Sequence, residues 1–105
     1  MFDGPFIVRA GGAAIGTVGL TQWDDGMAVA GGLFRPASNY NALEHATELN
    51  GITATQPAKL SLCWDDGKPL HCELVTLVDW SREAGEEARE IAVYGVADSK
   101  FLEGN

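Results

Sequence analysis

Glycine is the residue type that most limits what this chain can fold into. There are 13 glycines among 105 residues, which is about twice the average usage, and they separate short apolar segments. Glycine placed in this way marks turns between strands, and a glycine inside a strand marks a bulge or a close approach of two backbones. The sequence therefore predicts a chain rich in β-strand.

Six segments between these glycines have strand character. They are residues 5–10, 13–23, 27–34, 59–64, 70–78 and 89–96. In the third segment Met27 is expected to point towards the core. In the fifth, residues 74–78 are almost all apolar at consecutive positions, which predicts burial on both faces of the strand.

The hairpin around residues 65–67 allows its register to be predicted. A three-residue loop with Gly67 in the left-handed conformation places Leu62 opposite Leu70 and keeps the apolar residues on one face. In this register Cys72 faces the core and Cys63 faces away from it. The two cysteines are therefore not expected to form a disulfide.

One substantial helix is predicted after residue 40. Asn41 is a good N-cap residue, and Glu44 three positions later completes a pattern similar to a capping box. A modest apolar stripe follows, and Asn50-Gly51 is a plausible C-terminal stop. A second, short helix is predicted over residues 98–102.

These elements predict a fold class. Short loops join most of the strand pairs, and such loops permit only antiparallel neighbours. We expect one α+β domain over residues 1–105, with a curved, mostly antiparallel sheet of five to six strands and one main helix packed on one face.

The charge balance excludes several classes of function. The chain carries 15 acidic and 7 basic side chains, a net charge of −8, whereas nucleic acid and anionic membranes both require a basic surface. The N-terminus has no signal-peptide pattern, and no apolar run approaches the roughly 18 residues of a membrane span. We therefore predict a cytoplasmic protein that binds neither nucleic acid nor membrane.

The sequence offers little for catalysis or metal binding. His71 and Cys63 are the only candidate base and nucleophile, and no orienting third residue or oxyanion motif accompanies them. His45 lies between Glu44 and Glu48, without the ligand cluster of a zinc site. We expect no catalytic residue, no metal and no cofactor.

The tetrapeptide Trp-Asp-Asp-Gly occurs twice, at residues 23–26 and 64–67. One interpretation is a duplicated hairpin whose tryptophan and carboxylate tips bind a ligand. The other is that Asp-Gly is a preferred hairpin turn and that tryptophan is common at strand ends. The sequence favours the second interpretation, because the flanking residues are not similar.

Several spaced motifs resemble a family of small bacterial proteins with no assigned activity. They are Gly12 to Thr17; Met27, Val29, Ala30, Gly32, Phe34 and Pro36; Asp66 to Leu70; Asp79 to Glu83; and Gly85, Arg89, Glu90 and Gly95. The resemblance implies a one-domain bacterial protein and adds no mechanism. Ala28 and Trp80 depart from the family's usual glycine and tyrosine.

The leading functional hypothesis is a non-enzymatic module that binds a protein. The module is either an inhibitor or immunity-type protein, whose partner would be a basic protein such as a nuclease toxin, or a protein that binds a second copy of itself. An acidic surface suits a basic partner. The expected surface is aromatic and acidic, comprising Trp64, Asp65, Asp66, Asp79, Trp80, Glu83 and Glu86.

Two alternatives stay open. The first is a binding protein for an anionic small molecule, or a minor enzyme, with its site at the open end of the sheet among Trp23, Arg35, Tyr40 and Trp80. The second is a structural part of a larger assembly, which predicts a sizeable apolar patch on the surface.

Overall fold

The computed structural model describes residues 4–85 and 88–103. Within them lie nine strands and three helices of four or five residues. The strands are β1 (Phe6–Ala10), β2 (Ala13–Val18), β3 (Gln22–Asp24), β4 (Val29–Pro36), β5 (Glu48–Leu49), β6 (Ile52–Thr53), β7 (Leu60–Cys63), β8 (Leu74–Asp79) and β9 (Arg89–Tyr94). The helices are α1 (Ala42–His45), α2 (Ser81–Ala84) and α3 (Ser99–Glu103).

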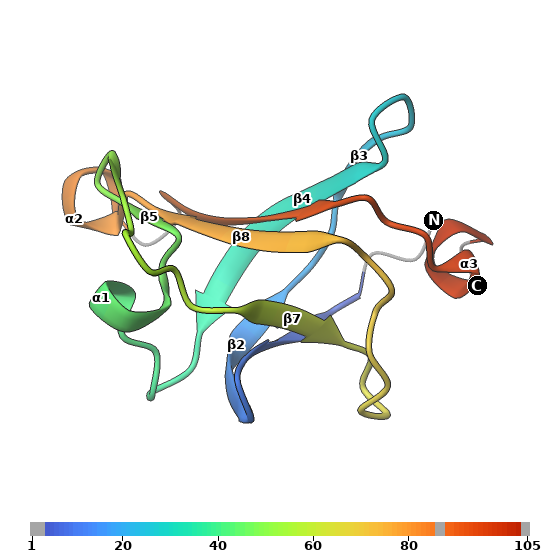
Figure 1. Cartoon of the computed structure of the whole chain (residues 1–105), viewed down its shortest axis with the longest axis horizontal. Coiled ribbons are helices and arrows are strands. Elements are labelled where there is room, and N and C mark those ends of the chain that lie inside the picture. Colours follow the sequence, from blue (N-terminus) through green and yellow to red (C-terminus); the bar gives the residue numbers. More distant parts are fainter. Residues whose placement is uncertain (1–3, 86–87, 104–105) are drawn as a thin grey trace.

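The strands form one bent sheet that does not close. Its hydrogen-bonded order is β6-β5-β8-β9-β4-β2-β1-β7, with β3 also paired to β4. Every pair is antiparallel except β5 with β8, which is parallel. The bend brings β7 and β2 below the layer that contains β8 and β4 (Figure 1).

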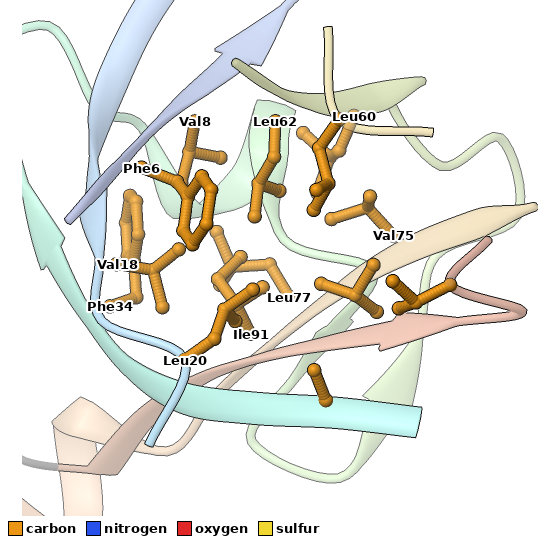
Figure 2. Packing of buried hydrophobic residues seen from close by; sticks show 14 of the residues in the cluster. Phe6, Val8, Val18, Leu20, Phe34, Leu60, Leu62, Val75, Leu77 and Ile91 are labelled. Carbon is orange, nitrogen blue, oxygen red and sulfur yellow. The ribbon is translucent and has the colours of Figure 1, made fainter. Parts of the chain in front are cut away.

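The core fills the space between these two layers. Val8 and Leu62 from the lower layer point towards Leu77 and Ile91 from the upper layer (Figure 2), and all four side chains are 0–1% exposed. Successive strand residues point to opposite sides of a sheet, so alternate residues of β8, β9 and β4 face away from this core.

The predicted fold class is wrong in its strand count and in its helix. The structure has a mixed sheet of nine strands instead of five to six, and no described helix packs on a sheet face as a main helix. The predicted strand over residues 13–23 divides into β2 and β3. The regular structure of the described residues is therefore mostly strand, arranged as one sheet around one core.

The expected helix after residue 40 is a single turn. Asn41 does cap it, because its side chain accepts a hydrogen bond from the Leu43 N–H at 3.0 Å. Thr47 then leaves the helical path: its N–H donates to the Leu77 carbonyl, and its hydroxyl accepts from the Leu77 N–H. Pairing with β8 provides these hydrogen bonds, so tertiary contacts override a weak local helix preference.

Asn50 and Gly51 form a hairpin turn rather than a helix end. Both have positive φ, 49° and 84°, and they join β5 to β6. A two-residue turn with positive φ at both positions strongly favours Asn-Gly. The same dipeptide thus fits a helix stop and a tight hairpin, and the pairing of β5 with β8 selects the hairpin.

The predicted register of the second hairpin is confirmed. Cys63 and Pro69 are opposite each other in an antiparallel β-bridge, and the Leu70 N–H donates to the Leu62 carbonyl at 2.9 Å. Gly67 has φ of +87°. Both cysteines are free. The prediction that Met27 points into the core is wrong, since its side chain is 71% exposed.

Candidate functional site

Two residues of the predicted partner-binding surface lie inside the protein. Trp64 is 4% exposed and Asp79 is fully buried. The Trp64 ring packs edge-on against Phe6 with 4.8 Å between ring centres, and its indole N–H donates to Asp98 at 3.4 Å. These two side chains hold the fold together and are not presented to a partner.

The other residues of that predicted surface do not come together. Asp65 and Asp66 are exposed at the tip of the second hairpin, whereas Trp80 and Glu83 lie at α2, at the opposite end of the molecule (Figure 1). Trp80 is 38% exposed. Glu86 lies outside the described residues.

The predicted ligand pocket is not assembled either. Trp23 packs on Phe101 of α3, with 5.7 Å between ring centres. Tyr40 packs on Phe34 near α1. The cavities over β3 and β4, beside Asp98, beside α1 and beside β7 are each lined by at most one of Trp23, Arg35, Tyr40 and Trp80.

Asp79 is the centre of a polar cluster at one end of the sheet. The Tyr40 hydroxyl donates to it at 2.5 Å, the Ser81 N–H at 2.8 Å and the Arg89 Nε at 3.3 Å. Burial raises the pKa of Asp79, but the hydrogen bonds from Ser81 and Tyr40 and the charge of Arg89 outweigh it, so the pKa lies below its usual value.

This cluster does not supply a base at neutral pH. Burial and the hydrogen bond to Asp79 raise the pKa of Tyr40, so its hydroxyl keeps its proton. Arg89 compensates the charge of Asp79, and a buried carboxylate that is paired and hydrogen-bonded is a stable structural element. The arrangement ties α2 and the residues before α1 to the end of β8.

Asp98 is the second buried carboxylate, 5% exposed, at the other end of the sheet. It accepts hydrogen bonds from the backbone N–H groups of His71, Lys100 and Phe101. Burial alone would raise the pKa of Asp98. These hydrogen bonds and the one from Trp64 lower the pKa by more than burial raises it, so the net shift is downward. Asp98 therefore caps α3 and ties it to the second hairpin.

Beside Asp98 lies a shallow cavity of about 430 Å³, lined by Trp64, Lys68 and His71 among others. The Lys100 ammonium group stands 4.3 Å from the centre of the Trp64 ring. Cationic and anionic groups both line this cavity, so its charge does not indicate one class of ligand.

The candidate nucleophile and base, Cys63 and His71, do not form a pair. Cys63 is 7% exposed, and no hydrogen bond joins it to His71. Burial raises the pKa of the Cys72 thiol, which makes it a poorer nucleophile. No group of three or more histidine, cysteine, aspartate or glutamate side chains in the described ranges is placed to hold a metal ion.

The strongest candidate site is the side of β3, β4, β9 and β8 that is turned away from the core, which we call the outer face. Three rows of paired residues cross it: Val29, Tyr94 and Leu74; Gly31, Ala92 and Thr76; Leu33, Glu90 and Val78. At the edge, Asp24 pairs with Val29 and Gln22 with Gly31.

The outer face is mainly apolar and lacks a cover from any described segment. Leu74 is 55% exposed and Tyr94 is 39% exposed, and the other apolar side chains of the three rows are half-buried. The three helices lie at the two ends of the sheet (Figure 1). A continuous apolar patch of this kind on a small domain marks an interaction site more often than isolated exposed residues do.

Carboxylates flank this apolar surface. Asp24 and Glu90 are both exposed, and neither has an ion-pair partner among the described residues. Arg35 is the basic residue of the outer face, and it lies at the end of β4 that pairs with β2. The part of the outer face over β3 and β9 is therefore apolar with an acidic margin.

The outer face was not identified from the sequence, although one signal pointed to it. Residues 74–78 were expected to be buried on both faces, and the structure covers only the inner face, with Val75 and Leu77. The apolar pattern of β8 therefore extends to a face that no described segment covers.

The comparisons with known proteins do not add an identity. Protein-family models, curated proteins and solved structures were compared with the chain, and none matches. The resemblance to a family of small bacterial proteins stays a prediction. Among the described residues, no helix has the length and apolar character needed to cross a membrane.

Proposed function

We propose that this protein is a non-enzymatic binding module that docks a basic partner protein on its outer face. One observation carries the proposal: β8 and β9 have apolar residues on both faces, and in the described residues only the inner face is covered. Interfaces combine an apolar centre with a polar rim. The outer face has both, with Tyr94 and Leu74 in the apolar part and Asp24 and Glu90 at the margin.

Charge favours a basic protein over a second copy of this chain. Two copies would each bring a net charge of −8, and like charges brought together across an interface cost free energy. A basic partner instead gains from Asp24 and Glu90, neither of which is engaged in an ion pair among the described residues. The same attraction would speed its association at low salt.

The proposal is tested by one pair of matched substitutions. Leu74→Lys and Leu43→Lys make the same change at two exposed leucines, one on the outer face and one, 85% exposed, on α1. Proteins retained by each variant and by the wild type are identified from lysate of the organism that encodes the chain, and their affinities are then measured with purified components at two salt concentrations.

We expect a basic protein that binds the wild type and Leu43→Lys but binds Leu74→Lys about tenfold or more weakly, as for a central interface residue. Its affinity should fall as salt increases. The proposal is contradicted if Leu74→Lys keeps full affinity, if the partner is acidic, or if the wild type retains no specific protein. A wild-type dimer that Leu74→Lys dissociates also overturns it, because the occupant is then a second copy.

A further inference from the structure

Gly31, at the middle of the outer face, has no reason within its own chain to be glycine. Its φ is not positive, and a Cβ built there would lie 3.5 Å from the Ile91 carbonyl oxygen and 3.7 Å from Gln22 Oε1, which are ordinary contact distances. An alanine therefore fits without strain. Glycine within a strand is less favourable than alanine, and no described contact requires glycine at this position.

The missing side chain leaves a groove. A cavity of about 270 Å³ lies over Gly31, and its outward-facing lining includes Gln22, Asp24, Glu90 and Ala92. Ala92 pairs with Gly31, so two small residues form the floor. The groove can thus hold a narrow, flexible chain of methylene groups lying flat on the sheet.

The polar side chains around this floor are two carboxylates and one neutral amide. Gln22 and Asp24 are on β3, on one side of Gly31, and Glu90 is on β9, diagonally across the floor. None of the residues that line the cavity is basic. A cation entering the groove meets a carboxylate at either end, whereas an anion or a neutral apolar chain leaves both carboxylates without a counter-charge, although Asp24 accepts a hydrogen bond from the Met27 N–H at 3.2 Å.

We propose that the groove over Gly31 receives a lysine or arginine side chain of the partner, with its methylene groups on Gly31 and Ala92 and its charged group against Glu90 or Asp24. Basic side chains bury their aliphatic part along apolar surface in this manner. This inference rests on the proposed function and names the group on the partner that the outer face recognises.

The test uses the isolated protein and a small probe, so it is independent of finding the partner. The protein is titrated with n-butylguanidinium, which reproduces the end of an arginine side chain, to tens of millimolar at low ionic strength. The neutral analogue n-butylurea is the matched control. Binding is followed by the amide chemical shifts of Gln22, Gly31 and Ala92 in NMR spectra.

We expect saturable shifts at these amides with n-butylguanidinium and none with n-butylurea. Gly31→Ala, which raises the floor, and Glu90→Gln, which removes one carboxylate, should each weaken binding about fivefold or more. The groove assignment is overturned if n-butylurea binds equally well or if the shifts are confined to other residues. It is also overturned if both variants bind as the wild type does or if no binding is seen. The comparison of Leu74→Lys with Leu43→Lys is unaffected by that result, so the two failures can be told apart.

Discussion

Gly31 and Gly32 are neighbours in β4, and they face opposite sides of the sheet. A Cβ on Gly32 would lie 1.7 Å from the Gly19 carbonyl oxygen, so the inner side has no room for any side chain. A Cβ on Gly31 would meet no atom closer than 3.5 Å. The fold requires glycine at position 32 and tolerates a side chain at position 31. The inner face is therefore filled, and the outer face is left open.

The same difference holds along β8. Leu77 is fully buried on the inner face, while Leu74 on the outer face is 55% exposed. Both are leucines of one strand, so hydrophobicity alone does not distinguish them; what differs is the presence of a cover. The outer face has an apolar part like the inner face, and it differs in its polar margin and in lacking a cover among the described residues.

The largest effect is expected from the two glycines. Gly32→Ala should lower the free energy of unfolding by at least about 3 kcal/mol or prevent folding, because the added methyl group overlaps the Gly19 carbonyl oxygen. Gly31→Ala should leave stability unchanged or raise it by up to about 1 kcal/mol. Urea unfolding of both variants beside the wild type measures the difference. Equal destabilisation by the two substitutions contradicts the contrast between the faces.

The second comparison uses the two leucines of β8. Leu77→Ala should cost about 2–5 kcal/mol, the usual range for truncating a buried leucine. Leu74→Ala should cost less than about 1 kcal/mol, because much of its side chain is already in water. Thermal unfolding monitored by circular dichroism reports both values. A loss of several kcal/mol for Leu74→Ala would show that the outer face is part of the core.

The third comparison concerns carboxylates and depends on pH. Asp98→Asn should cost about 1–3 kcal/mol at pH 7, since Asp98 accepts several hydrogen bonds inside the fold. Glu90→Gln on the outer face should change stability by less than about 0.5 kcal/mol.

The pH dependence of the Asp98→Asn effect follows from its lowered pKa. The folded protein binds a proton at Asp98 less readily than the unfolded chain, whose aspartates titrate near about pH 3.9. The stabilisation is therefore complete above that pH and is lost as the pH falls through the lower folded pKa. The gap between wild type and Asp98→Asn should narrow below about pH 4, and a gap independent of pH in urea unfolding would contradict this assignment.

Sequence-based prediction succeeded where a local signal was strong and unopposed. Gly67 fixed the register of the second hairpin, and Asn41 was correctly identified as an N-cap. It failed at residues 46–50, where helix and strand patterns were both weak and hydrogen bonds to β8 decided the outcome. Long-range pairing of this kind has no local signature, which is why the helix and the strand count were both wrong.

The candidate site was predictable only in part. Trp64 and Asp79 have the composition of a binding surface, but each is buried and bonded to a polar side chain, Asp98 for the tryptophan and the half-buried Arg89 for the aspartate. Neither partner is a close neighbour in the sequence. The outer face combines residues from β3, β4, β9 and β8, so it exists only after the sheet has formed. In the sequence it is indicated only by residues 74–78, which are apolar on both faces of the strand.

Side-chain footprinting of the partner complex tests the central claim most directly. Hydroxyl radicals oxidise exposed side chains, and Leu74, Tyr94, Trp80 and Leu43 are all more than a third exposed in the free protein. Docking on the outer face predicts protection of Leu74 and Tyr94 by the partner, with Trp80 and Leu43 oxidised as in the free protein. Protection of Trp80 with Leu74 and Tyr94 still reactive would place the interface at the α2 end of the molecule and contradict the account.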